Sequence, residues 1–147
     1  MFITDTATIV TRLIDGKYYP YEKMFAGNPA IAVTIGRQEL LSCIDRAMLF
    51  MKDNDKKPVV FDFMGDACKV SVKSQYGTMD EDISIVKTGD DITFGCNPVF
   101  MMDVLKALES DDVTVYLSNK NMPALIKDKE GSYKYLILPV NLSGSSK

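Results

Sequence analysis

Two short stretches decide the fold of this 147-residue chain, Val33-Thr34-Ile35-Gly36 and Ile92-Thr93-Phe94-Gly95. In each, three residues that favour a strand are followed by a glycine, and each glycine leads into an apolar pattern with helical spacing. Gly36 and Gly95 lie 59 positions apart, so the same junction occurs twice. A junction repeated at such a period indicates a tandem repeat of one structural unit.

The first copy predicts the order strand, helix, strand, strand, strand. A short strand over residues 31–35 passes through Gly36 into a helix over residues 37–51, because apolar residues recur there every three or four positions. Alternating apolar residues and the Gly65-Asp66 turn signal then predict three strands. Their expected ranges are residues 59–64, 67–74 and 79–86.

The second copy predicts the same order. A strand over residues 92–94 leads through Gly95 into a helix over residues 98–108, with Pro98 in the first turn, where proline is tolerated. Three strands are expected after it, over residues 113–117, 124–127 and 133–140. The pattern therefore predicts an α+β domain over residues 30–142, built as a tandem βαβββ repeat.

Residues 1–29 are expected to form a strand and a linker ahead of this domain. Residues 7–14 are rich in Thr, Ile and Val and end at Asp15-Gly16, so they predict a strand. The linker, residues 17–29, contains two prolines, a glycine and several aromatic residues, which argues against a regular helix or a central strand. Residues 143–147 are small and polar and predict a flexible tail.

The composition favours an ordinary globular protein and sets limits on its partners. Apolar residues make up 46% and charged residues 25%, and 17 basic against 20 acidic residues give a net charge of -3. This balance argues against a general polyanion binder, so any DNA contact must be local. No apolar run approaches the length of a membrane span, and three scattered cysteines without CxxC spacing argue against a disulfide framework or a zinc site. We expect a cytoplasmic protein.

An enzyme is a poor fit to this sequence. Histidine is absent, which removes the commonest general base and metal ligand. There is no glycine-rich phosphate loop, and Cys68 alternates with charged neighbours as an apolar-face residue does. The acidic run at residues 80–82 could attract a cation, but similar runs at residues 90–91 and 111–112 favour ordinary turn chemistry. We expect no catalysis, no cofactor and no metal.

Three motifs carry a resemblance to a known family. Residues 12–18, Arg-Leu-Ile-Asp-Gly-Lys-Tyr, resemble the segment that closes the middle domain of bacterial DNA polymerase III sliding clamps. Residues 94–98 and 103–108 are similar to the second helix of the last clamp domain, and residues 135–142 resemble its C-terminal ending. The chain therefore resembles, from about residue 7 to residue 142, the C-terminal domain of the DNA polymerase III beta subunit with the end of the middle domain.

The resemblance implies the DNA-clamp fold and a non-catalytic function. Family members are rings of βαβββ units in which helices line the hole, sheets lie outside and subunits join head to tail around duplex DNA. As processivity factors of the bacterial replisome, they hold DNA polymerase III and repair proteins on DNA and are placed there by a clamp loader. The expected partners are therefore duplex DNA, proteins with a clamp-binding motif, the loader and further copies of the subunit.

The resemblance also implies a hydrophobic pocket for a short extended peptide. The positions that match it are Tyr19, Pro20, Lys23 and Met24 in the linker, and Leu136, Leu138, Pro139 and Val140 in the last strand. Tyr19 stands where the family usually has proline, and Asn141 replaces a basic residue. The sequence lacks the first domain and nearly all of the second, which in the family supply half of the pocket, so we expect peptide binding to be weak.

The resemblance places two further sets of residues. Leu49 and Phe50 match the position where the last domain meets the next subunit, although the end of a helix that covers the core is an equally good interpretation. Arg37, Arg46, Lys52 and Lys106 lie on the helices that would face DNA, although such charges often form a solvated face. We also expect self-association, because the strand over residues 7–14 needs a pairing partner. The alternative function is a freestanding clamp-like adaptor that binds partner peptides without encircling DNA.

Overall fold

The computed structural model describes residues 1–25, 27, 29–51, 57–128 and 130–142. Two of the sequence-based expectations, the DNA-facing Lys52 and the flexible tail at residues 143–147, lie outside these residues. Within the described ranges, no helix combines the length and the apolar character needed to cross a membrane.

The predicted tandem βαβββ repeat is confirmed. The first unit consists of β3 (Ile31–Gly36), α2 (Arg37–Met48), β4 (Val59–Met64), β5 (Ala67–Ser74) and β6 (Gly77–Thr88). The second consists of β7 (Ile92–Cys96), α3 (Pro98–Ala107), β8 (Asp112–Leu117), β9 (Ala124–Lys127) and β10 (Lys134–Ile137). The bounds of β4, β5 and β9 agree with the expected ranges, because turn residues limit these strands at both ends.

The two units are interlocked in one eight-stranded antiparallel sheet. Its order is β10-β9-β8-β3-β6-β5-β4-β7, so the first strand of each unit pairs with a strand of the other unit. β3 pairs with β8 from Ile31↔Leu117 to Gly36↔Asp112, and β7 pairs with β4 from Ile92↔Phe63 to Cys96↔Val59. Neither unit has a complete sheet of its own, so the two must fold as one domain.

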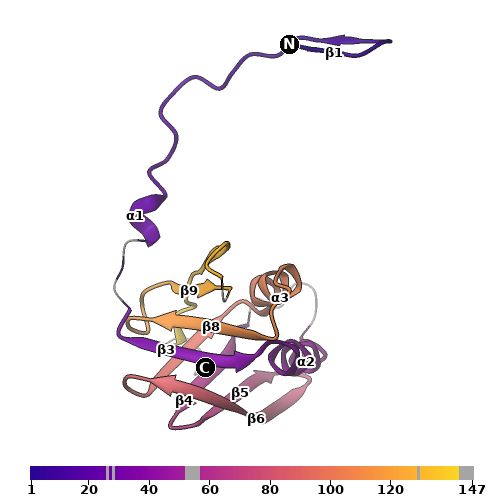
Figure 1. The fold of residues 1–147 in the computed structure, drawn as a ribbon. Coiled ribbons are helices and arrows are strands. Elements are labelled where there is room, and N and C mark those ends of the chain that lie inside the picture. The colour runs from indigo at the N-terminus through magenta and orange to yellow at the C-terminus, as the bar shows by residue number, and fades with distance from the viewer. Residues whose placement is uncertain (26, 28, 52–56, 129, 143–147) are drawn as a thin grey trace.

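The core lies between this sheet and the two helices, which pack side by side on one of its faces (Figure 1). On the sheet, alternate residues of β3, β5 and β8 are buried, as the period of a strand requires. On the helices, buried residues recur at helical spacing. The buried helical residues are Leu40, Cys43, Ile44 and Ala47 in α2, and Pro98, Met101, Met102, Val104 and Leu105 in α3.

The two helices are also tied together by polar contacts at one end. Arg37, the first residue of α2, donates from its side chain to the carbonyl oxygens of Ser110 at 2.7 Å and Leu105 at 3.2 Å. Its backbone N–H donates to the carbonyl of Asp111 at 2.8 Å. Arg37 therefore satisfies carbonyls at the C-terminal end of α3, where a positive charge also complements the helix dipole.

The last strand is shorter than expected. The sequence predicts a strand over residues 133–140, whereas β10 ends at Ile137. Beyond it the chain crosses to β7, at the opposite end of the strand order, and Val140 N–H donates to the Gly95 carbonyl at 2.8 Å. This hydrogen bond ties the segment after β10 to β7. Pro139 has no N–H, so it cannot donate to a ladder here.

The prediction for residues 7–14 is wrong in its extent. Only Thr8–Ile9 (β2) is a strand, and it pairs with Phe2–Ile3 (β1) in a small hairpin. Residues 10–14 have no regular structure, and Leu13 and Ile14 are more than 90% exposed. Figure 1 shows the hairpin and the following segment projecting away from the domain. A strand needs a neighbour for its backbone groups, and β1 offers only two residues.

The prediction that the linker contains no regular helix is also wrong in part, because Glu22–Phe25 form the short helix α1. Pro20 precedes this helix, where a missing N–H costs nothing, and its carbonyl accepts from Lys23 N–H at 3.3 Å. Aromatic contacts also support the turn, since Tyr21 packs edge-to-face on Tyr18 and on Phe25.

Gly89, between β6 and β7, provides a test of this architecture. Its φ is +89°, and a Cβ there would lie 2.5 Å from the carbonyl oxygen of Ala30. We expect Gly89→Ala to lower the free energy of unfolding by about 3 kcal/mol, from backbone strain and a clash that no side chain can relieve. Chemical denaturation measures this.

Gly131→Ala is the matched control, because Gly131 also has a positive φ, +73°, but nothing lies within 4 Å of its Cβ position. It should cost about 1 kcal/mol from the backbone alone. Equal losses for the two variants would contradict the close approach of the β6–β7 connection to Ala30.

Candidate functional site

A groove runs along the seam where the curled sheet fails to close. Its volume is about 720 Å³, and three segments of the chain contribute to its lining. The lining residues are Thr93 and Gly95 in β7, Lys120 and Asn121 between β8 and β9, and Pro139, Val140, Asn141 and Leu142 at the end of the described chain. Val140 binds the backbone of β7, although residues 138–142 are not a strand of the sheet.

Leu142 anchors the segment through a contact that requires glycine. A Cβ at Gly95 would lie 2.6 Å from Leu142 Cδ2 and 3.3 Å from its Cγ, so the leucine occupies the space that a side chain would need. Gly36, the equivalent residue of the first unit, has only ordinary neighbours, with Glu39 at 3.7 Å. The two repeats therefore differ at this junction, and both members of the Gly95–Leu142 contact line the groove.

Polar contacts shape the other walls. Thr93 Oγ1 donates to the Asp62 carboxylate at 2.5 Å, which directs this hydroxyl onto β4. In the turn between β8 and β9, the side-chain oxygen of Asn119 accepts from Asn121 N–H at 2.9 Å. Such a side-chain turn fixes the backbone at residues 119–121. The groove thus has one wall on the sheet and one on a defined turn.

The structure gathers the C-terminal members of the predicted peptide pocket. Pro139 and Val140 line the groove, and Leu138 directly before them is 67% exposed. Leu136 is half-buried in β10. An apolar, partly extended segment with an exposed leucine can contact an apolar ligand side chain.

The linker members of the predicted pocket lie elsewhere. Tyr19, Pro20, Lys23 and Met24 are exposed, and none of them lines the groove at the seam. The linker instead borders a second cavity of about 570 Å³, formed by Tyr21, Glu22 and Phe25 with Gly131, Ser132 and Lys134. This structure therefore does not bring the two halves of the predicted pocket together, and the complete pocket stays a prediction.

The groove residues that come from β7 and from the β8–β9 turn are not among the predicted site residues. Thr93, Lys120 and Asn121 carry no local pattern that points to a site. The sequence predicts Gly95 as the junction between strand and helix, and that glycine is the available signal. A glycine in a strand interior often marks a close approach of other parts of the chain, which here is Leu142.

Leu49 and Phe50, at the predicted subunit interface, have different surroundings. Leu49 is 81% exposed. Phe50 is half-buried, and its ring carbons lie 3.2 Å from the position a Cβ would take on Gly77, so the ring packs on the turn between β5 and β6. Phe50 therefore contacts its own domain, and Leu49 is the member of the pair that solvent can reach.

Two of the predicted DNA-facing arginines already have partners within the domain. Arg37 donates to carbonyls at the end of α3. Arg46 pairs with both carboxylate oxygens of Glu81 on β6, and its hydrogen bonds hold the pKa of Glu81 below the ordinary value. Lys106 is exposed on α3.

The thiols of this domain are poorly suited to catalysis. Cys43, Cys68 and Cys96 are all buried, and burial is the largest cause that raises the pKa of each to about 12. They remain protonated at neutral pH, whereas a nucleophilic cysteine needs the thiolate. Among the described residues, no group of three or more acidic, cysteine or histidine side chains is placed to hold a metal ion.

Two interlocked βαβββ units, whose helices pack side by side on one shared sheet, are the architecture of the DNA-clamp domain. The chain matches the family described as DNA polymerase III beta subunit, C-terminal domain, over residues 22–141, and it belongs to that family. It is 28% identical over 143 residues to a beta sliding clamp of Staphylococcus aureus. That alignment covers 95% of this chain and 38% of the relative.

Solved structures agree with this assignment. A putative DNA polymerase III beta subunit from Eubacterium rectale is 41% identical with a TM-score of 0.86, over 90% of this chain and 36% of that one. The beta subunit from Thermotoga maritima is 25% identical with a TM-score of 0.83. The match covers 89% of this chain and 36% of that one. The chain thus spans little more than a third of the length of these relatives. The family resemblance and the clamp fold expected from the sequence are both confirmed.

The contact between Gly95 and Leu142 predicts the behaviour of the groove. We expect Gly95→Ala to displace Leu142 and to break the bond from Val140, because the added methyl group takes the space of the leucine. The Val140 amide should exchange with solvent at least several-fold faster, while global stability falls by about 1 kcal/mol. NMR-detected hydrogen exchange measures both.

Gly36→Ala is the control, since the equivalent Cβ meets only ordinary contacts. It should leave the exchange of Val140 unchanged. Retained protection of Val140 in Gly95→Ala would mean that Leu142 does not anchor the segment.

Proposed function

We propose that this chain is the C-terminal part of a bacterial replicative sliding clamp. In this function a DNA polymerase processivity factor encircles duplex DNA when all its domains are present, and tethers polymerase and repair proteins by their peptides. The observation that carries the proposal is the incompletely closed seam, which displays an apolar segment with an exposed Leu138 beside a groove. The family match supports it.

The proposed chemistry is binding without catalysis. The chain has no histidine, and burial raises the pKa of its three thiols. A processivity factor needs neither group, because it acts by holding other proteins at DNA. The proposed setting is the bacterial cytoplasm, with a clamp loader as a further partner.

The peptide site is proposed to combine the C-terminal segment with the linker. Leu138 and Met24 are 67% and 48% exposed, so both can contact an added apolar side chain without rearrangement of the core. Leu136, Pro139 and Val140 would extend the surface on one side, and Tyr19, Pro20 and Lys23 on the other. Because the linker residues of this site are exposed and lie away from the groove, closing the linker over a ligand has an ordering cost, and this cost favours weak binding.

We expect a short extended peptide that ends in Leu and Phe to bind this chain with a Kd of about 1 mM. Burying two such side chains contributes roughly 3 to 6 kcal/mol before ordering costs. Leu138→Asp and Met24→Asp should each abolish binding, and both positions are exposed enough for the variants to fold. NMR titration measures the affinity and maps the site.

Leu49→Asp is the matched control, because it places the same charge on another exposed leucine. It should bind like the unchanged protein. Chemical shift changes that avoid both the linker and residues 136–142 would contradict the proposed site.

DNA is proposed to be held by the topology of a closed ring, with weak direct contacts. On α2, Arg37 and Arg46 are offset by Glu39 and Asp45, and on α3 Lys106 is offset by Asp103. Arg37 and Arg46 are moreover engaged within the domain. Few phosphates would be neutralised, so few counterions would be released.

We therefore expect this chain to show no measurable affinity for linear duplex DNA at an ionic strength of about 0.15 M. Fluorescence anisotropy with a labelled duplex measures this. Asp103→Lys, which adds a positive charge to the exposed face of α3, should introduce weak binding that disappears as salt increases. Micromolar binding of linear duplex DNA by the unchanged chain would contradict the proposal that DNA is held only by the closure of a ring.

A subunit contact is proposed at the end of α2. Leu49 is exposed there beside Phe50, whose ring is held on Gly77, so a second chain would meet a preformed apolar ridge. The exposed apolar residues of the β1–β2 hairpin add a second surface that favours association. A homo-oligomer is the proposed state.

The near-neutral helices favour one alternative function. A freestanding adaptor of clamp-like fold would bind partner peptides at the same groove and would need no basic surface toward DNA. The internal engagement of Arg37 and Arg46 supports this alternative. Retention of the protein on closed circular DNA, with release on linearisation, distinguishes a ring from an adaptor.

A further inference from the structure

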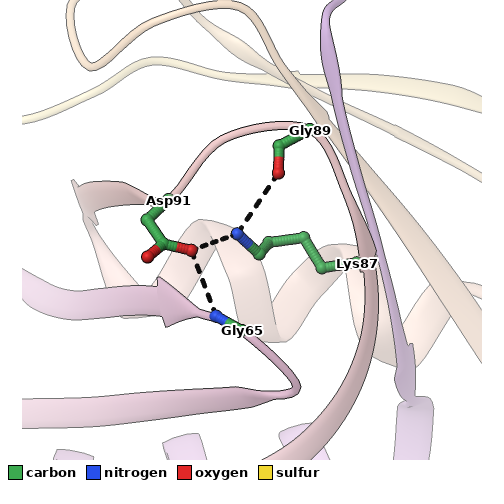
Figure 2. Close-up of polar contacts among 4 residues, drawn as sticks. All are labelled: Gly65, Lys87, Gly89 and Asp91. Atoms are coloured by element: carbon green, nitrogen blue, oxygen red, sulfur yellow. Dashed lines mark hydrogen bonds and ion pairs between the residues drawn. The ribbon is translucent and has the colours of Figure 1, made fainter.

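Three connections of the chain meet at one end of the sheet. They are the entry from the linker into β3 at Ala30, the turn between β4 and β5 at Gly65, and the junction between the two βαβββ units at residues 89–91. Gly89 packs against Ala30, since a Cβ there would lie 2.5 Å from the Ala30 carbonyl oxygen. On the other side, the carboxylate of Asp91 accepts from Gly65 N–H at 3.1 Å (Figure 2).

Lys87 holds the junction in this position. Its ammonium group pairs with the Asp91 carboxylate and donates to the Gly89 carbonyl at 3.4 Å, as Figure 2 shows. The side chain of Lys87 is only 4% exposed, although that of Asp91 is 62% exposed. A buried ammonium group is costly unless it is paired, so Lys87 has a strong tendency to keep both partners.

This ion pair differs from the others on the surface of the domain. Lys69 and Asp80 are 3.4 Å apart with both side chains about half exposed, which is the setting of a weak pair. At Asp91, the bonds from Lys87 and then from Gly65 N–H lower the pKa of the carboxyl group, so it is charged at neutral pH. The junction at residues 89–91 is therefore bound by Lys87 of β6 and by Gly65 of the β4–β5 turn, and Gly89 also contacts Ala30.

We propose that the Lys87–Asp91 pair is a positioning device that fixes where the linker leaves the domain. By holding Gly89 against Ala30, the pair couples the junction between the two βαβββ units to the first residues of β3. The linker joins the domain at Ala30, so its direction there depends on the contact that Gly89 makes with Ala30. The proposal concerns the path of the linker and holds whether or not the linker binds a peptide.

Hydrogen exchange on the full chain tests this coupling. In Lys87→Met the stem is kept and the charge is lost, so Asp91 and Gly89 lose their anchor. We expect the amides of Gly65, Ile31 and Ala32 to exchange about tenfold faster, while those of Val70 and Ile83 keep their rates within about twofold. Lys69→Met, at the exposed pair, is the control and should change none of these rates.

Asp91→Asn separates the two contacts of the carboxylate. The amide oxygen can still accept from Gly65 N–H, but the charge that holds Lys87 is gone. We expect Gly65 to stay protected while Ile31 and Ala32 exchange faster. Because Asp91 is largely exposed, this variant should fold even if Lys87→Met does not.

A distance measurement supplies a readout that loss of stability alone would not change. Spin labels at Lys17→Cys in the linker and Lys73→Cys on β5 report the direction of the linker, and the buried native thiols should not take up label. In Asp91→Asn the distance distribution should broaden relative to the protein with Asp91. Unchanged exchange at Ile31 and Ala32, equal acceleration of all protected amides, or an unchanged distance distribution would each overturn the proposal.

Discussion

The pairing of β3 with β8 is the constraint on which the rest of this structure depends. Six register pairs, from Ile31↔Leu117 to Gly36↔Asp112, join the first strand of one unit to a strand of the other. Each unit alone would leave a sheet edge and an apolar face exposed, and strand edges with unpaired backbone groups are unstable in water. Interlocking removes both problems and sets α2 beside α3, where Arg37 links them.

The two edges of the same sheet, β10 and β7, do not pair with each other, and this open edge supports the proposed function. Pro139 cannot donate to β7, so the C-terminal segment is held by the Val140 bond and by Leu142 on Gly95. Segments with few backbone hydrogen bonds belong to the least stable parts of a protein, and such parts supply many binding sites. The β3–β8 pairing holds the two units together, whereas the segment beside β7 leaves the apolar side chain of Leu138 exposed.

Several basic side chains of this domain bind groups of the domain itself. Arg37 and Arg46 each connect elements that are distant along the chain, whereas Lys87 binds partners in the connection directly after its own strand, and all three are engaged with carbonyls or a carboxylate. Little positive charge remains on the helices for phosphate groups. A clamp that slides must not bind DNA tightly, so a near-neutral helical face is compatible with the proposed ring and also with the adaptor.

The sequence by itself determined the elements whose signals are local. The period of apolar residues and the bounding turns predicted β4, β5 and β9 to the residue, and the repeated junction at Gly36 and Gly95 predicted the tandem repeat. Three short motifs were enough to indicate the family, because each is a run of neighbouring residues. These features need no knowledge of what lies across the fold.

Only the tertiary structure decided the features that depend on a distant partner. Residues 10–14 form no strand because β1 is too short to pair with them, and β10 ends early because the neighbour of Pro139 is β7. Arg37 meets Ser110 across 73 positions and Arg46 meets Glu81 across 35, so their engagement has no local signal. The groove brings Leu142 against Gly95, a contact that also has no local signal. Such contacts follow from how strands and helices pack, which the order of residues in one segment does not express.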